Sequence, residues 1–144
     1  MRGWVEWVRV EPGSTRVKAK LDTGATTSSI DARNQEVFKR DGKRWVRFTI
    51  EDRDGREVEL ERRVERFVKI RRPDDKFDRR PVVKMSLCLG RELRSVEVSL
   101  ADREGFVYPV LLGRNFLAGV AVVDSGQTLT SEPDCPGAAE TAAR

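Results

Sequence analysis

The sequence predicts an all-β domain that closes into a small barrel with one short helix. Three observations favour this fold class: apolar and polar residues alternate with a period of two along most of the chain, turn signals separate the alternating segments, and only one segment has a clear helical pattern. A chain of 144 residues has room for one domain with one core. We place that domain at residues 1–130 and expect a disordered tail at 131–144, where Pro, Gly and Ala occur without a period.

The alternation is clearest in Thr15–Leu21. Val17, Ala19 and Leu21 fall on one face of an extended strand, and the basic residues between them fall on the other. The same pattern predicts eight further strands: Trp4–Val10, Arg44–Ile50, Glu57–Leu60, Val64–Ile70, Val82–Leu89, Leu93–Leu100, Val107–Leu112 and Val120–Val123.

Turns and helices are fewer. Asp41-Gly42, Asp54-Gly55 and Gly90 stand between predicted strands, as hairpin turns do. Arg114–Ala118 lies between two glycines and predicts the short helix. A second helical turn is possible near Asp31–Val37.

The composition excludes several kinds of active site. The chain has no His, which excludes a His-Glu-x-x-His zinc site, a Ser-His-Asp triad and a Cys-His dyad. Cys88 and Cys135 are too far apart for a Cys-x-x-Cys ligand pair, and we interpret them as a buried thiol and a tail thiol in a reducing compartment. If the protein is a hydrolase, carboxylates are the obvious catalytic groups that remain.

The location and the charge give weaker indications. No apolar run approaches the roughly 20 residues of a membrane span, and no N-terminal signal segment is recognisable, so we expect a cytoplasmic protein. Residues 62–80 hold nine basic and four acidic side chains, a net charge of +5 within a chain whose formal net charge is +4. This stretch is either a solvated hairpin or a site for an acidic partner.

The segment Leu21-Asp22-Thr23-Gly24-Ala25 follows directly on an apolar strand. By itself it is consistent with an ordinary turn, in which Asp bonds its own backbone and Gly adopts a positive φ. A second segment changes this interpretation. In Val110–Leu117, an apolar strand breaks at Gly113-Arg114-Asn115 and enters the short helix.

Asp22-Thr23-Gly24-Ala25 near the start and Leu-Leu-Gly113-Arg114-Asn115 near the end, with strands between them, resemble the retropepsins. These are aspartic proteases of retroviral type, in which each subunit supplies half of the active site. The resemblance spans about Lys18 to Val123. Within that superfamily the chain looks most like a bacterial group named as ATP-dependent zinc proteases, some of which are encoded beside ATP-grasp ligases that add glutamates to proteins. The sequence departs from that name, because it has neither a His for zinc nor a Gly-x-x-x-x-Gly-Lys-Ser/Thr loop for phosphates.

The resemblance implies peptide-bond hydrolysis by two aspartates that share one proton. The chain offers one clear copy of the motif, so the second Asp22 would come from a second chain in a symmetric homodimer. No metal and no other cofactor is required.

The resemblance also implies roles for the neighbours of Asp22. Thr23 would bond across the dimer, Gly24 would let a backbone N–H approach the carboxylate, and Ala25 would contact substrate. Gly113 would open the strand behind the Asp loop, and Arg114 with Asn115 would support the site and the interface. The alternative for Arg114-Asn115 is an ordinary helix start with surface charge.

Asp124-Ser125-Gly126 has the same signature as the candidate catalytic segment. Too little chain follows it for a second lobe, so we interpret it as a β-turn, and a noncatalytic role at an interface stays open. A retropepsin also needs a flap over its substrate. The candidates are Glu51–Arg56 and Arg71–Arg80, and if the second covers the cleft, Arg71 and Arg72 would bind an acidic peptide such as a poly-glutamate tail.

Two other functions compete with proteolysis. One is a catalytically silent module with the same fold that binds peptides without cutting them. The other is a basic β-barrel that binds nucleic acid, but the sequence has no recognisable base-stacking motif. We therefore expect a protein or peptide substrate and a second copy of the chain as partners, and neither nucleic acid nor a membrane.

Overall fold

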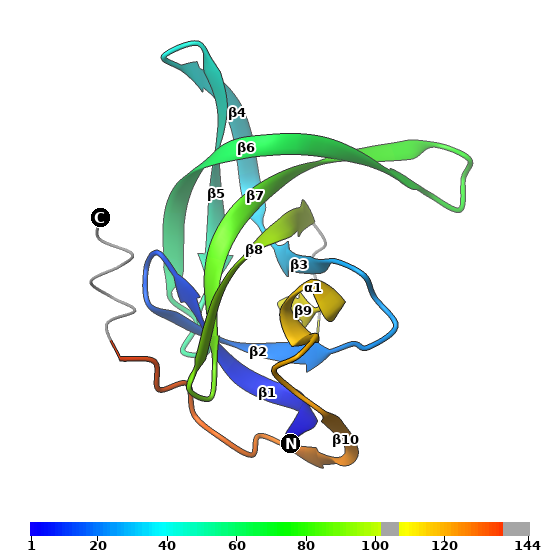
Figure 1. Ribbon diagram of the computed structural model, residues 1–144. Helices are drawn as coiled ribbons and strands as arrows, with labels where there is room; N and C mark the ends of the chain where they lie inside the picture. The colour runs from blue at the N-terminus through cyan, green and yellow to red at the C-terminus, as the bar shows by residue number, and fades with distance from the viewer. Residues whose placement is uncertain (102–106, 137–144) are drawn as a thin grey trace.

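A computed structural model describes residues 1–101 and 107–136 of the chain. These residues form strands and one short helix (Figure 1). The elements are β1 (Arg2–Glu11), β2 (Thr15–Leu21), β3 (Ser28–Asp31), β4 (Arg33–Arg40), β5 (Lys43–Glu51), β6 (Glu57–Arg71), β7 (Phe77–Leu89), β8 (Glu92–Ala101), β9 (Val110–Leu112), α1 (Arg114–Leu117) and β10 (Val123–Thr128).

Six of these strands close into a barrel. They follow one another in the order β1-β2-β9-β3-β8-β7, and β7 pairs back with β1 from Val8 to Glu11. The alternating residues of the strands point their apolar side chains inward, so that Val8, Val17 and Ile30 are almost completely buried in one core. The all-β barrel with one short helix is thereby confirmed.

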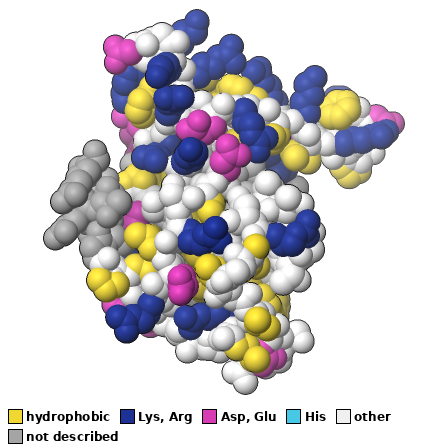
Figure 2. All heavy atoms as spheres, in the orientation of Figure 1, with side chains coloured by type: hydrophobic (Ala, Val, Ile, Leu, Met, Phe, Trp, Pro, Cys, Tyr) yellow, Lys and Arg dark blue, Asp and Glu magenta, His cyan; other side chains and the backbone are white. Residues whose placement is uncertain are grey.

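The remaining strands extend this barrel on two sides. β6, β5 and β4 continue antiparallel from β7 as an outer sheet, and β10 pairs with the first residues of β1. The β6–β7 hairpin projects beyond the barrel on the side toward which the loop between β2 and β3 also projects (Figure 1). Lys and Arg side chains gather over this outer sheet and hairpin, with acidic side chains among them (Figure 2).

Several segments differ from the sequence-based prediction. Glu57–Leu60 and Val64–Ile70 belong to one strand, β6, whose first half pairs with β5 and whose second half pairs with β7. The expected helical turn near Asp31–Val37 is wrong, because most of these residues lie in β3 and β4. β3 was not expected, and β9 occupies only the last part of Val107–Leu112.

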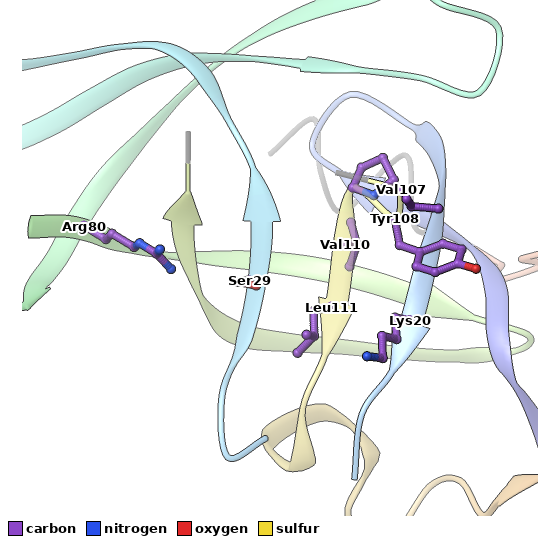
Figure 3. Close-up of a pocket in the computed structure, with 8 residues that line it drawn as sticks. Lys20, Ser29, Arg80, Val107, Tyr108, Val110 and Leu111 are labelled. Carbon is purple, nitrogen blue, oxygen red and sulfur yellow. The ribbon is translucent and has the colours of Figure 1, made fainter. Parts of the chain in front are cut away.

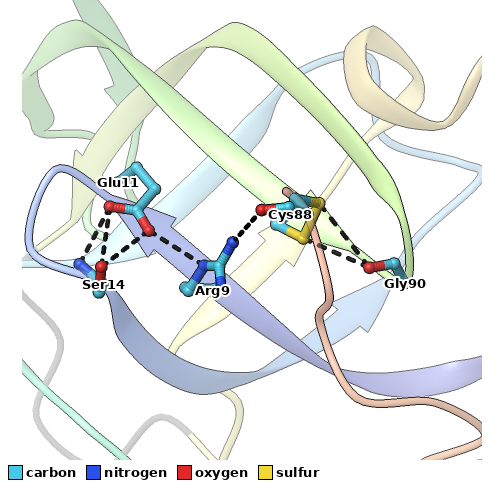
Figure 4. Close-up of a disulfide and its surroundings, with 6 residues drawn as sticks. Arg9, Glu11, Ser14, Cys88 and Gly90 are labelled. Atoms are coloured by element: carbon cyan, nitrogen blue, oxygen red, sulfur yellow. Dashed lines mark hydrogen bonds and ion pairs between the residues drawn. A yellow bond between two sulfur atoms is a disulfide. The ribbon is translucent and has the colours of Figure 1, made fainter. Parts of the chain in front are cut away.

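The interpretation of the two cysteines as free thiols is also wrong. Cys88 of β7 and Cys135 form a disulfide, which joins the end of the described chain to the turn between β7 and β8 (Figure 4). The backbone carbonyl of Cys135 also accepts a hydrogen bond of 2.9 Å from Arg9 Nη2. The reducing compartment that we inferred from free thiols therefore loses its support.

Residues 131–136 lie against the barrel, although we expected disorder from Ser131 onward. The buried carboxylate of Glu6 accepts hydrogen bonds from the N–H groups of Thr130 (2.8 Å) and Ser131 (3.3 Å). Glu132 forms an ion pair of 3.0 Å with Arg53. Polar contacts and the disulfide of Cys135 hold this segment, so an apolar periodicity could not reveal it. Residues 137–144 lie outside the described part of the chain. No helix in the described ranges is long and apolar enough to cross a membrane.

Candidate active site

Asp22 lies at the point where β2 ends and the chain turns. One of its carboxylate oxygens, Oδ1, accepts a hydrogen bond of 2.9 Å from the N–H of Gly24, and its backbone carbonyl accepts one of 3.2 Å from the N–H of Ala25. Asp22 and Ala25 are partly exposed, and Thr23 and Gly24 are exposed. The turn therefore presents a carboxylate, a hydroxyl and a small residue together at the surface.

Strand β9 supports this turn from behind. The N–H of Asp22 donates to the carbonyl of Leu112 at 2.8 Å. Gly113 follows, and a Cβ atom added to it would lie only 2.5 Å from the carbonyl oxygen of Thr27. Gly113 thus permits a close backbone approach that any other residue would prevent.

Helix α1 then ties the loop through its first residue. The N–H of Arg114 donates to the carbonyl of Ala25 (2.8 Å), and its guanidinium donates to the carbonyl of Thr23 (3.0 Å) and to Oγ1 of Thr26 (2.9 Å). Arg114 is thus an anchor of the Asp22 loop in its own chain, not an unattached surface charge. Its role at a subunit interface stays a prediction.

Asn115 supports the loop through a residue that we did not single out from the sequence. The hydroxyl of buried Ser28 donates to Oδ1 of Asn115 (2.7 Å) and accepts from the N–H of Gly113 (3.0 Å). The side-chain amide of Asn115 donates to the carbonyl of Glu97 on β8 (2.8 Å). In a run of small polar residues, no sequence signal marks Ser28 as the buried one.

One of the two flap candidates lies away from this site. The N–H of Arg53, within Glu51–Arg56, donates to the carbonyl of Arg16 at 2.8 Å. Arg16 stands near the start of β2, whereas Asp22 follows its end, so this turn is docked at the opposite end of the strand. The hairpin between β6 and β7 remains as the flap candidate.

Arg71 and Arg72 lie in that hairpin, and both already have acidic partners. Arg71 pairs with Asp75 at 2.7 Å, and Arg72 pairs with Asp74 at 2.8 Å and with Asp78 at 3.2 Å. The hydrogen bond that Arg72 donates to the carboxylate of Asp78, followed by the charges of Asp74 and Asp78, raises the pKa of Arg72 above its ordinary value. Acidic residues of the same hairpin thus offset the charge that we expected to bind substrate.

Asp124 reproduces the local geometry of Asp22 without its support. Asp124 Oδ1 accepts a hydrogen bond of 2.8 Å from the N–H of Gly126. The segment lies in β10, where the pairing with β1 is irregular, rather than in the free β-turn that we expected. Across residues 1–101 and 107–136, no group of three or more His, Cys, Asp or Glu side chains lies close enough together to hold a metal ion.

This arrangement of an Asp-Thr-Gly turn over a Gly-Arg-Asn segment agrees with the result of a family comparison. Residues 1–133 match the model of the RimB-like family, described as retropepsin-like aspartic endopeptidase RimB. The chain belongs to this family. The resemblance to a bacterial group of retropepsins is therefore confirmed.

Proteins similar to this RimB-like chain include longer ones. The chain is 33% identical over 119 residues to a protein of Shewanella halifaxensis and 32% identical over 126 residues to one of Parasynechococcus marenigrum, both named "Probable alpha-L-glutamate ligase". The matches cover 81% and 85% of this chain but only 26% and 27% of those proteins. The RimB-like chain thus spans about a quarter of the length of these relatives.

A solved structure has the same fold. The crystal structure of a Legionella pneumophila protein of unknown function (DUF785) is 32% identical to this RimB-like chain and superimposes with a TM-score of 0.75. The match covers 90% of this chain and 95% of the other.

Proposed function

We propose that the protein is one subunit of a homodimeric aspartic endopeptidase, in which Asp22 and the Asp22 of a second copy activate one water molecule. The observation that carries the proposal is the exposed turn of Asp22, Thr23 and Gly24, held from behind by Gly113 and Arg114. The segment at Asp124, which has a similar residue pattern, is part of the edge strand β10, so a second chain is the natural source of a second equivalent carboxylate.

Two carboxyls held close together share one proton, because repulsion between two negative charges opposes the ionisation of both. The ionised carboxylate removes a proton from water while the water oxygen attacks the peptide carbonyl carbon. The protonated carboxyl donates its proton to the carbonyl oxygen, which gives a tetrahedral diol. The C–N bond then breaks as the nitrogen receives a proton, and the products are a carboxylic acid and an amine.

The exposed residues of the turn suit a dimer. In a single chain, Thr23 and Gly24 face outward and the turn is open to solvent. A second copy approaching along a two-fold axis would bring the two turns together, with each Thr23 hydroxyl free to bond the opposite loop. Thr23→Ala should therefore weaken the dimer, and Thr23→Ser should restore it, as measured by sedimentation.

We further propose that the substrate is an acidic peptide, such as a poly-glutamate tail of a protein. The chain carries a formal net charge of +4, and similar proteins that contain this region are named as glutamate ligases. A hydrolase that trims glutamates would act on the product of such a ligase. Arg71 and Arg72 would contact the peptide only if it displaces their present acidic partners.

The test is cleavage of a poly-glutamate peptide and of a mixed peptide library by the wild-type protein and by Asp22→Asn, followed by mass spectrometry. We expect cleavage by the wild type alone, increasing with protein concentration as dimers form, and no effect of a chelator. Activity that survives Asp22→Asn, or that a chelator removes, would contradict the mechanism. Binding of peptides without cleavage at any protein concentration would favour the catalytically silent module instead.

A further inference from the structure

A cavity of about 380 Å³ opens over the outer face of β2, β9 and β3 (Figure 3). This volume falls within the roughly 300–1,000 Å³ of small-molecule sites. Lys20, Ser29 and Leu111 line it from the three strands, and Tyr108 lines it from the segment that leads into β9. Arg80 reaches it from β7.

The register of the strands places three of these side chains in one row. Lys20 of β2 is the direct partner of Leu111 of β9, and Leu111 is also the partner of Ser29 of β3. The next row toward the start of β2 is formed by Ala19, Val110 and Ile30, which are all buried in the core. Because side chains alternate along a strand, the row of Lys20 lies on the opposite face, outside the barrel.

This row is close to the candidate catalytic carboxylate. Lys20 lies in β2 and precedes Asp22 by two residues, so the two residues are no more than about 7 Å apart along the chain. Leu111 immediately precedes Leu112, whose carbonyl binds the N–H of Asp22. A peptide whose scissile bond lay at Asp22 would therefore place a neighbouring side chain in this cavity.

The lining is basic on one side and apolar on another. Two cations, Lys20 and Arg80, line the cavity, and no acidic residue is among the described residues that line it. Lys20 is exposed and has no ion-pair partner within residues 1–101 and 107–136. Arg80 already has an interaction in the chain, so the argument relies on Lys20.

We propose that this cavity is the subsite that recognises a glutamate side chain of the substrate. Lys20 would bind the carboxylate, the hydroxyl of Ser29 would donate a hydrogen bond to it, and Leu111 would contact the methylene groups. The proposal rests on the proposed function, since it makes the cavity a part of the same cleft. It assigns the recognition of acid to the strand that carries Asp22, rather than to Arg71 and Arg72, which are already paired.

Binding can be measured apart from cleavage in the Asp22→Asn background. The probes are two labelled peptides, penta-glutamate and its neutral counterpart penta-glutamine, followed by fluorescence anisotropy. We expect Lys20→Gln to weaken penta-glutamate binding about tenfold, the effect of losing one charge-assisted hydrogen bond, and to leave penta-glutamine binding nearly unchanged.

Lys18→Gln is the matched control, because it removes the same charge from the same strand. Lys18 lies over the ring of Trp7, 5.4 Å from its centre, and lines a different cavity. We expect it to change penta-glutamate binding by less than about twofold, since only a screened long-range charge is lost. The proposal would be overturned if the Lys18 and Lys20 variants lost the same affinity for penta-glutamate. It would also be overturned if Lys20→Gln weakened the binding of penta-glutamate and penta-glutamine equally.

A charge reversal separates this inference from the proposed function. In the protein with Asp22 intact, Lys20→Glu should shift cleavage from glutamate-containing toward lysine-containing peptides. If Lys20→Glu cleaves with the same preference for glutamate-containing peptides as the wild type, the proposed subsite is contradicted while the proposed proteolytic activity stands. If the wild type cuts nothing while binding in the Asp22→Asn background still depends on Lys20, the proposed proteolysis fails and the subsite stands.

Discussion

The guanidinium of Arg114 donates a hydrogen bond of 3.0 Å to the backbone carbonyl of Thr23, a residue 91 positions earlier in the chain. The same guanidinium binds Oγ1 of Thr26, so one side chain holds both limbs of the Asp22 loop. The conformation of the candidate catalytic turn is thus set by a residue from the far end of the domain, not by the turn sequence alone.

Arg114→Lys should loosen the Asp22 loop without unfolding the barrel. A lysine keeps the charge but cannot make both bonds in the geometry of the guanidinium fork, so we expect a loss of about 1 kcal/mol of local stability. Hydrogen exchange of the amides of Gly24 and Ala25 should become faster. Arg66→Lys, which alters an exposed pair with Glu97 on β8, is the control and should leave these amides unchanged.

Gly113→Ala should disrupt the site more than a similar change elsewhere. The new Cβ would lie 2.5 Å from the backbone oxygen of Thr27, and backbone cannot move aside as a flexible side chain can. We expect a destabilisation of about 1–3 kcal/mol in urea unfolding, typical of overpacking, together with loss of cleavage. Gly126→Ala is the comparison, since its Cβ would lie 3.4 Å from a carboxylate oxygen of Asp124. Equal effects of the two substitutions would contradict this account.

Reduction of the disulfide should lower the stability of the domain. Cys88 and Cys135 are separated by 47 residues, and a loop of that length restricts the unfolded chain by up to about 4 kcal/mol in the chain-entropy model. We expect the wild type to have a lower Tm with reductant than without it. Cys135→Ser should show the lower Tm in both conditions. A wild-type Tm that does not respond to complete reduction would be evidence against the bond in solution.

Glu61 should make the outer sheet sensitive to acid. Desolvation opposes ionisation of its carboxyl, but hydrogen bonds and charges from Arg40 and Arg47 outweigh it and lower the pKa of Glu61 below its ordinary value of 4.5. Because the pKa of Glu61 is lower in the folded protein than in the unfolded one, its ionised carboxylate stabilises the fold at every pH above the unfolded-state pKa. This stabilisation is lost as the pH falls through the folded-state pKa. Glu61→Gln should therefore be less stable than the wild type near neutral pH, and denaturant titrations of the two proteins should converge once the pH has fallen below the lowered folded-state pKa of Glu61.

The alternation of residues was sufficient to predict the barrel because its strands bury one face. In the outer sheet it predicted β5, many of whose residues alternate between buried and partly buried, but it missed β4 and divided β6, because these two strands do not bury one continuous apolar face. β4 runs through Arg33–Arg40 with most side chains exposed or only partly buried, so no apolar period distinguished it from a helical turn. β6 appeared as two strands because Glu61, Arg62 and Arg63 interrupt the period where the strand changes partner.

Part of the candidate site was predictable from the sequence. The segments at Asp22 and Gly113 were recognisable from their residue types, and they meet as that resemblance implied. Ser28 and Lys20 were not singled out, because their importance comes from register: Ser28 is buried beneath the Gly113 backbone and Lys20 stands in one row with Leu111 and Ser29. The sequence of a single strand does not reveal which residues of the neighbouring strands lie beside it.

Strand β1 shares one of its edges between two partners. β10 pairs with its beginning, at Arg2, Gly3 and Val5, and β7 pairs with its end, from Val8 to Glu11. The backbone of β1 is therefore fully paired only after β10, more than 100 residues further along the chain, has been synthesised. Such non-local pairing is typical of domains that fold in milliseconds to seconds rather than microseconds. A chain that stopped before residue 123 would keep an open edge at β1, a template for aggregation during synthesis.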